Sequence, residues 1–184
     1  MKTAWDQDAY LAALCFAAEA HRGQTVPGSD GLPYLVHLAS VAMEVMGALQ
    51  HEAVKHPTRA VLCALLHDTI EDTAVTHAEV HAAFGPEVAD GVLALSKDAA
   101  LPKAARMEDS LARIRRLAPE IWMVKLADRI TNLQEPPAHW THEKRRRYWE
   151  EAGRIRDALG DASAYLRARI EAKMATYTQY LEED

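Results

Sequence analysis

One short segment constrains the fold of this chain more than any other, the run AVLCALLHDTIEDT at residues 60–73. Residues 60–66 are apolar on every side of a helix, so all sides of this helix need burial. Four ionisable residues follow: His67, Asp68, Glu71 and Asp72. Burying a carboxylate is costly unless its charge is paired, and no Lys or Arg lies between residues 60 and 95. A bound metal ion would supply the missing positive charge.

Helical periodicity continues along most of the chain, and the composition is biased toward Ala, Leu, Glu and Arg, which favour helix. Gly and Pro gather in residues 25–33, which predicts a loop there. We expect helical segments over residues 4–22, 34–50, 57–73, 76–97 with a Phe-Gly-Pro turn inside, 101–120, 121–134, 141–159 and 162–181. The sequence therefore predicts one compact all-α domain over residues 1–184, with the helices of about 141–184 packed on it.

Charge and cysteine content limit the classes of partner and the compartment that we expect for this protein. The formal net charge of −6 does not attract polyanions to the chain as a whole, and aromatic residues are not interleaved with the basic ones, so nucleic acid is not an expected partner. No segment predicts a membrane span or a signal peptide. Cys15 and Cys63 lie in apolar helical patterns, so we expect two buried free thiols and a cytoplasmic protein.

Two more polar residues stand in apolar surroundings, His37 near the start of a predicted helix and Asp128 within IWMVKLADRITNL. With His67 and Asp68 they make two imidazoles and two carboxylates, which suit a divalent ion of borderline hardness and leave positions for water and substrate. Each residue alone also fits an ordinary role, as a core histidine, a solvated helix end or part of a helical ion pair. We predict a metal site because the four occur together.

The neighbours of these residues suit phosphate chemistry. Glu71 and Asp72 lie one helical turn beyond the His-Asp pair, where they would orient a metal-activated water or move its proton. Lys125 and Asn132 share a helix face with Asp128. A substrate with several phosphates also needs cations around it, and the nearest candidates are Lys97, Lys103, Lys125 and Arg129.

The segment LLHDTIEDT resembles the HDxxED motif of the alarmone-hydrolase branch of the HD-domain superfamily, which includes the hydrolase domain of Rel/Spo proteins and the small Mesh1-like hydrolases. The resemblance continues in order through AHRGQ, PYLVH, FGPEV, KLADRITNL and PPAHWTHEKRRRYWEEA, over nearly the whole chain. It implies an all-α HD-domain bundle. It also implies a Mn²⁺-dependent hydrolase that removes the 3′-pyrophosphate from guanosine tetra- or pentaphosphate.

The functional positions of this family carry over residue by residue. Its metal ligands match His37, His67, Asp68 and Asp128. Its catalytic acidic pair matches Glu71 and Asp72. Asn132 matches the family's nucleotide-contacting asparagine, and Lys125 matches a position where the family keeps a basic residue. Tyr148 matches the family's tyrosine near the substrate.

One departure from the family pattern concerns the base. Family members usually read GQxRKxGxPY, with the Arg-Lys pair on or beside the guanine, whereas this chain reads GQTVPGSDGLPY and has no basic residue there. Arg22 is the expected substitute because a guanidinium plane stacks on a base, although a solvated helix-end arginine is an equal interpretation. Lys97 and Lys103 are expected at the rim of the site, because SKDAALPK has the composition of a short loop.

These observations predict an alarmone pyrophosphohydrolase with a nucleotide substrate. The altered loop leaves open a phosphohydrolase of other nucleotides, such as NADPH or nucleoside monophosphates. A non-catalytic nucleotide-sensing module is a third hypothesis, disfavoured because the metal ligands and the acidic pair are all present.

Overall fold

The computed structural model describes residues 4–181, and all regular secondary structure in that range is helical. Its one isolated β-bridge joins Thr25 and Pro33. The all-α prediction is confirmed. The α-helices are α1 (Gln7–Ala20), α2 (Leu35–His51), α3 (Pro57–Leu66), α4 (Thr69–Asp72), α5 (His77–Phe84), α6 (Pro86–Leu95), α7 (Arg106–Ile114), α8 (Pro119–Asn132), α9 (His142–Leu159) and α10 (Ala164–Tyr177). The 3-10 turns η1 (Gly160–Ala162) and η2 (Thr178–Tyr180) follow α9 and α10.

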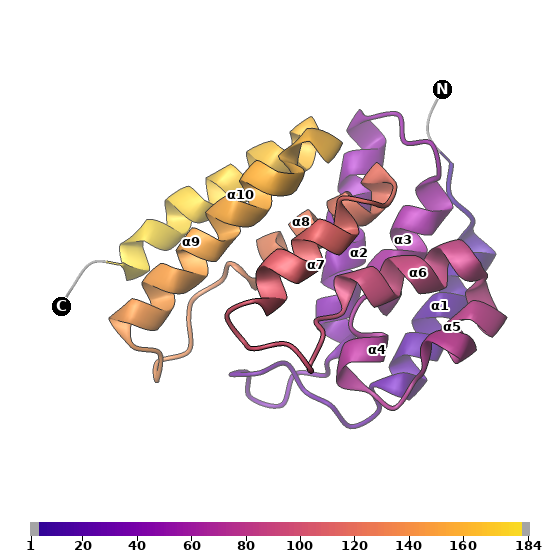
Figure 1. The fold of residues 1–184 in the computed structure, drawn as a ribbon, viewed down its shortest axis with the longest axis horizontal. Coiled ribbons are helices and arrows are strands. Elements are labelled where there is room, and N and C mark those ends of the chain that lie inside the picture. The colour runs from indigo at the N-terminus through magenta and orange to yellow at the C-terminus, as the bar shows by residue number, and fades with distance from the viewer. Residues whose placement is uncertain (1–3, 182–184) are drawn as a thin grey trace.

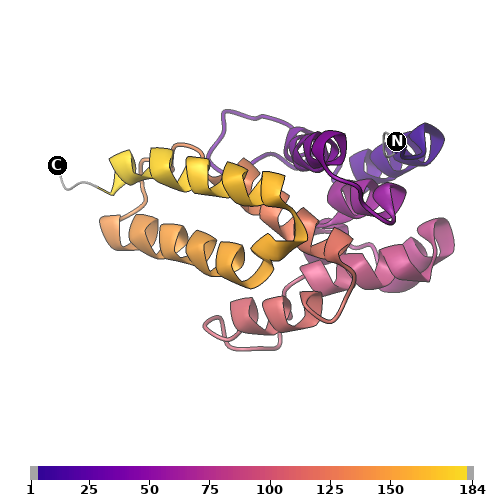
Figure 2. The ribbon, with the colours of Figure 1, turned by 90° about the horizontal axis from the view of Figure 1, so that it is seen from above.

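The core lies where α2, α3 and α8 meet. α3 contacts α1, α2, α6 and α8, and α8 also contacts α2, α9 and α10. Residues 60–66 of α3 are all buried, in agreement with their apolar sequence. Figures 1 and 2 show α9 and α10 as a pair at one side of the other helices, joined to them through α8. This pair belongs to the C-terminal unit predicted at about 141–184, of which residues 182–184 lie outside the described residues.

The helix predicted over residues 57–73 is interrupted, and this part of the prediction is wrong. α3 ends at Leu66 and α4 begins at Thr69, so His67 and Asp68 occupy the turn between them. On a regular helix two successive side chains point about 100° apart. The interruption lets both side chains reach the same point, since His67 Nε2 and Asp68 Oδ2 lie 2.9 Å apart.

The two cysteines differ in their surroundings, although both are free thiols. Cys63 is buried as predicted, and burial raises the pKa of its thiol to about 12. Cys15 is exposed, which corrects the expectation of two buried thiols. The reason is that α1 buries fully only Ala13 and Ala17, one turn apart on another of its faces.

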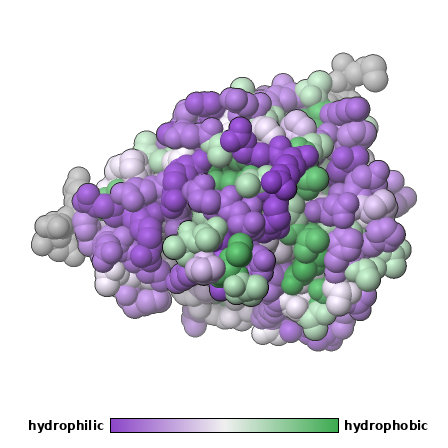
Figure 3. Space-filling view, viewed as in Figure 1, coloured by the Kyte–Doolittle hydropathy of each residue, from purple (hydrophilic) through white to green (hydrophobic). Residues whose placement is uncertain are grey.

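The surface shown in Figure 3 is mostly hydrophilic, with small separate hydrophobic areas. The large apolar side chains that are exposed are Leu11, Leu32, Val36, Met43 and Leu93. Leu32, Val36 and Met43 line the cavity of the candidate site. Among the described residues, no helix combines the length and the apolar character that a membrane crossing requires.

Candidate active site

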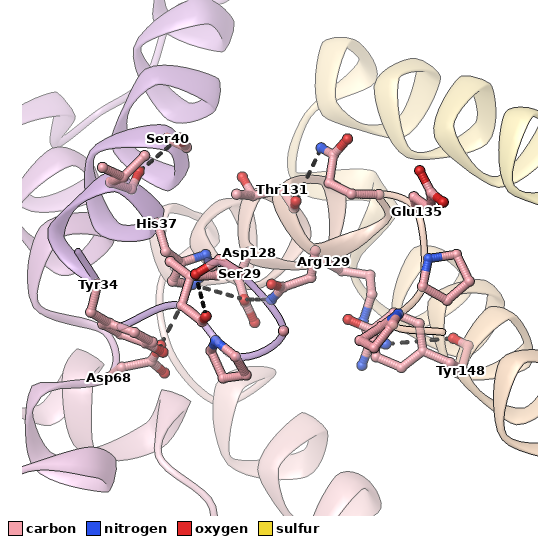
Figure 4. Close-up of a pocket in the computed structure, with 18 of the residues that line it drawn as sticks. Ser29, Tyr34, His37, Ser40, Asp68, Asp128, Arg129, Thr131, Glu135 and Tyr148 are labelled. Carbon is pink, nitrogen blue, oxygen red and sulfur yellow. Dashed lines mark hydrogen bonds and ion pairs between the residues drawn. The ribbon is translucent and has the colours of Figure 1, made fainter. Parts of the chain in front are cut away.

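The four predicted metal ligands come together where the start of α2, the α3–α4 turn and α8 meet: His37, His67, Asp68 and Asp128. The Nε2 atoms of the two histidines lie 3.3 Å apart. His37 Nε2 also lies 3.6 Å from Asp68 Oδ2 and 3.7 Å from Asp128 Oδ1. Figure 4 shows the side chains of His37, Asp68 and Asp128 gathered around one point. Helices far apart in the sequence thus direct two nitrogens and two carboxylates into one small volume.

The chemistry of this cluster fits a divalent metal ion. One ligand atom from each of His37, His67 and Asp128 lies within 4.8 Å of the other two. His67 Nδ1 lies 2.8 Å from the carbonyl oxygen of Ala64, so Nδ1–H donates to that oxygen. In the neutral imidazole Nε2 then keeps its lone pair for a metal ion. Imidazole nitrogens combined with carboxylates suit Mn²⁺, Zn²⁺ and similar ions.

Asp128 is held by two residues of its own helix. Lys125 Nζ donates to Asp128 Oδ2 at 2.9 Å, and Asn132 Nδ2 donates to Oδ1 at 2.6 Å. Burial alone would raise the pKa of Asp128, but Lys125 and His67 offset it and hold the pKa below its usual value. The helix face predicted for Lys125, Asp128 and Asn132 is therefore present, and it fixes the orientation of one ligand.

Burial and charge also oppose each other at the His-Asp pair. Burial alone would lower the pKa of His67, but the carboxylates of Asp68 and Asp128 raise it to about 9. For Asp68, burial acts to raise the pKa, yet His67 and His37 hold it well below the usual range. The carboxylates thus attract a positive charge. A bound metal ion would supply that charge.

Glu71 and Asp72 lie beside the cluster in different environments. The carboxylate of Glu71 accepts a hydrogen bond from the backbone nitrogen of Lys97 at 2.8 Å and another from its Nζ at 2.9 Å. Asp72 is exposed, and its Oδ2 lies 3.5 Å from the hydroxyl of Tyr34. Desolvation raises the pKa of Asp72, and the carboxylates of Asp68 and Glu71 raise it further. Asp72 therefore holds a proton more readily than an ordinary aspartate does.

A cavity of about 1180 Å³ opens beside the cluster, which is ample room for a nucleotide. Four predicted substrate residues line it: Lys97, Lys125, Asn132 and Tyr148. Arg22 and Lys103 are not among its lining residues, and both are exposed. Arg22 forms an ion pair with Glu19 at the end of α1, and Lys103 lies in the loop before α7.

Arg129, which the sequence also suggested as a cation for the phosphates, lines the cavity as well. It is buried, with its guanidinium carbon 4.1 Å from the centre of the Tyr148 ring. Figure 4 shows this pair on the opposite side of the cavity from Tyr34 and Asp68. Other lining residues come from the loop before α9 and from α9 and α10: Trp140, Lys144, Arg169 and Lys173. Trp140 and Lys144 belong to PPAHWTHEKRRRYWEEA and Tyr34 belongs to PYLVH, two segments that carry the resemblance, whereas Arg169 and Lys173 belong to no motif.

Known proteins resemble this chain in both sequence and structure. Residues 13–161 match the family model for the HD domain. MESH1 of Danio rerio, a guanosine-3′,5′-bis(diphosphate) 3′-pyrophosphohydrolase, is 32% identical over 165 residues, 88% of this chain and 89% of that protein. MESH1 of Homo sapiens is 33% identical over the same length, 88% of this chain and 90% of that protein. A solved structure of a metazoan SpoT orthologue that hydrolyses ppGpp has a TM-score of 0.81 and 25% identity, covering 98% of this chain and 100% of that one.

Proposed function

The chain belongs to the HD domain family, and from this we propose that it is a metal-dependent guanosine-3′,5′-bis(diphosphate) 3′-pyrophosphohydrolase. The proposed substrate is a guanosine tetra- or pentaphosphate alarmone. The observation that carries the proposal is the convergence of two histidines and two carboxylates on one point beside Asp72, in a cavity of nucleotide size. The MESH1 relatives, which match 88% of the chain, support the same reaction.

The reaction joins the oxygen of water to the 3′-phosphorus and breaks the bond from that phosphorus to the ribose O3′. Pyrophosphate leaves, and O3′ takes up a proton. Mn²⁺ is the proposed ion, held by His37, His67, Asp68 and Asp128. When bound, it supplies an activated water and polarises the phosphoryl group.

Glu71 and Asp72 have different proposed roles because their surroundings differ. Asp72, whose pKa is raised, is suited to take the proton of the attacking water and pass it toward O3′. Glu71 is bound by Lys97 at its backbone nitrogen and its Nζ, so it keeps that cation at the wall of the cavity. Asp72 is thus proposed as the proton-transfer group and Glu71 as the partner that positions Lys97.

Two cations are proposed to hold the phosphates of the substrate. Lys97 and Arg129 both line the cavity, and Arg129 is kept in place by the Tyr148 ring and by Glu151, whose carboxylate lies 3.4 Å from its Nη2. Fixed positive charge in a partly desolvated cavity stabilises the negative charge of the diphosphate as the bond from its phosphorus to O3′ breaks. Lys125 and Asn132 are bonded to Asp128, so we assign them to holding that ligand.

A panel assay tests the proposal. Purified protein loaded with Mn²⁺ would be incubated with guanosine tetraphosphate, NADPH and nucleoside monophosphates, with released pyrophosphate and phosphate measured separately. We expect pyrophosphate from guanosine tetraphosphate, and loss of this activity in His67→Ala. Clear activity on NADPH or on monophosphates, beside no pyrophosphate from the alarmone, would refute the assignment.

A specific observation also favours that alternative, a phosphohydrolase of other nucleotides. The loop that replaces the family's Arg-Lys pair contributes only uncharged residues to the cavity: Val26, Pro27, Gly28, Ser29 and Leu32. This wall has no cationic side chain to stack on a guanine. We propose a cytoplasmic location for either activity, since a free exposed thiol such as that of Cys15 persists in a reducing compartment.

A further inference from the structure

Three residues of the AHRGQ and Pro-Tyr motifs have no part in the chemistry described so far. They are His21, Gln24 and Tyr34. His21 and Gln24 directly follow α1, and Tyr34 directly precedes α2. Tyr34 nevertheless contacts the ligand Asp68, Gln24 contacts the backbone of Asp72, and His21 packs on Tyr34.

The hydroxyl of Tyr34 connects a metal ligand to the proposed proton-transfer group. Tyr34 donates to Asp68 Oδ2 at 2.6 Å, and the same hydroxyl lies 3.5 Å from Asp72 Oδ2. An ionised carboxylate can only accept a hydrogen bond, so the Tyr34 hydroxyl is the donor in this contact. Figure 4 shows the Tyr34 ring extending from the start of α2 to Asp68.

A second layer of contacts fixes the Tyr34 ring. His21 is buried, and its imidazole stacks on the Tyr34 ring with 4.9 Å between centroids and 18° between planes. His21 Nδ1 lies 2.8 Å from Gln24 Oε1, and Gln24 Nε2 donates to the backbone carbonyl of Asp72 at 2.8 Å. The loop after α1 thus holds the ring of Tyr34 and the backbone of Asp72 at the same time.

We propose that Tyr34 is a positioning residue that orients the Asp68 carboxylate toward the metal ion and keeps it at a fixed position relative to Asp72. His21 and Gln24 hold Tyr34 in place. A carboxylate that can rotate loses affinity for a metal ion, and the groups that hydrogen-bond to metal ligands commonly contribute 10- to 100-fold to affinity or activity. This inference rests on the proposed function only for its kinetic consequence. The effect on metal binding follows from the geometry around Asp68 alone.

The variant Tyr34→Phe tests the proposal, because it keeps the ring that stacks on His21 and removes only the hydroxyl. Metal-free protein would be titrated with Mn²⁺ by calorimetry. We expect the dissociation constant to rise by about 10-fold or more relative to the wild type. The matched control is Tyr10→Phe, since Tyr10 packs beside Trp5 outside the cavity and should leave the constant unchanged.

Kinetics separate positioning from substrate binding, because Tyr34 also lines the cavity. At saturating Mn²⁺ we expect Tyr34→Phe to lower kcat on guanosine tetraphosphate by about 10-fold and to change KM by less than 2-fold. A raised KM with unchanged Mn²⁺ affinity would make Tyr34 a substrate contact and overturn the proposal. An unchanged Mn²⁺ affinity with unchanged kcat would overturn it equally.

A second variant keeps the test valid if Tyr34→Phe folds poorly. Gln24→Ala removes the hydrogen bonds to His21 and to the Asp72 backbone but leaves the rings of His21 and Tyr34 unchanged. We expect it to raise the Mn²⁺ dissociation constant by about 3-fold. No change in that constant would contradict the role given to the loop. The two proposals can fail separately, because the Mn²⁺ titration needs no turnover. A wild type that binds Mn²⁺ but does not hydrolyse the alarmone would refute the proposed function, and the same titration would still test the role of Tyr34.

Discussion

Lys97 binds the carboxylate of Glu71 through two separate donors, its backbone nitrogen at 2.8 Å and its Nζ at 2.9 Å. Desolvation, Asp68 and Glu71 raise the pKa of the neighbouring carboxylate of Asp72, and Lys97 offsets only part of this effect. Two adjacent acidic residues that look equivalent in the sequence therefore have different surroundings, since Lys97 binds Glu71 directly and Asp72 lies beside the Tyr34 hydroxyl. This difference leads to the first prediction.

Asp72→Asn should lower kcat on guanosine tetraphosphate by about 100-fold or more, because a positioned general base commonly contributes 10²- to 10⁴-fold. The double variant Glu71→Gln with Asp72→Asn should still bind Mn²⁺ and should keep a melting temperature close to that of the wild type. Steady-state kinetics and calorimetry measure these effects, with the highly exposed Asp161→Asn as control. Near-normal turnover by the double variant would show that the acidic pair has no role in proton transfer.

His67→Ala should abolish stoichiometric binding of a divalent ion, because it removes the imidazole nitrogen that lies within 3.3 Å of His37 Nε2 and 2.9 Å of Asp68 Oδ2. Metal content after loading and dialysis gives the result. His81→Ala, on α5 away from the cavity, is the control and should bind as the wild type does. Equal metal content in His67→Ala and the wild type would rule out this cluster as the site.

Lys97→Met should lower kcat/KM for guanosine tetraphosphate by about 10-fold or more, since one charge-assisted hydrogen bond to a phosphate is lost. Glu71 also loses its ion pair and keeps only the bond from the backbone nitrogen of residue 97. Arg22→Met should have a smaller effect, because Arg22 pairs with Glu19 and does not line the cavity. The two variants would be compared under identical conditions. A larger loss in Arg22→Met would restore Arg22 as the base contact expected from the sequence.

Arg169→Met should lower the free energy of unfolding by about 1–3 kcal/mol, because it leaves the buried carboxylate of Glu44 without its cation. Arg169 Nε donates to Glu44 Oε2 at 3.0 Å and ties α10 to α2. Urea unfolding measures the loss, and Arg167→Met, a more exposed arginine on the same helix, should change stability little. Replacing Glu44 by Met as well should restore much of the lost stability.

Gly91→Ala should lower the melting temperature by about 3–10 °C. A methyl group there would lie 2.6 Å from Ile121 Cδ1 and 2.9 Å from Cys63 Sγ, where α6 packs closely against α8 and α3. Adding Ile121→Val removes the closest atom and should recover part of the loss. Gly153→Ala on α9 is the control, because its new methyl group would meet Met174 Cε at an ordinary 3.5 Å.

The sequence by itself determined the class of fold and the chemistry of the candidate metal site. Helical periodicity is a local property, so the apolar residues of α2, α3 and α8 could be recognised without knowing how these helices pack. A histidine or carboxylate within such a helix must be compensated when it is buried, which singled out His37, His67 and Asp128. The same reasoning applies to Asp68 beside His67.

Only the tertiary structure decided how those residues are arranged and which others join them. The break between α3 and α4 gives no signal in a run that is compatible with one helix. The bonds of Lys97 to Glu71 and of Tyr34 to Asp68 join positions 26 and 34 residues apart. Such pairs depend on the relative placement of packed helices and loops, which local periodicity does not specify. Arg22 is an example, because the sequence placed it near the base, whereas it lies outside the cavity and pairs with Glu19 one turn away.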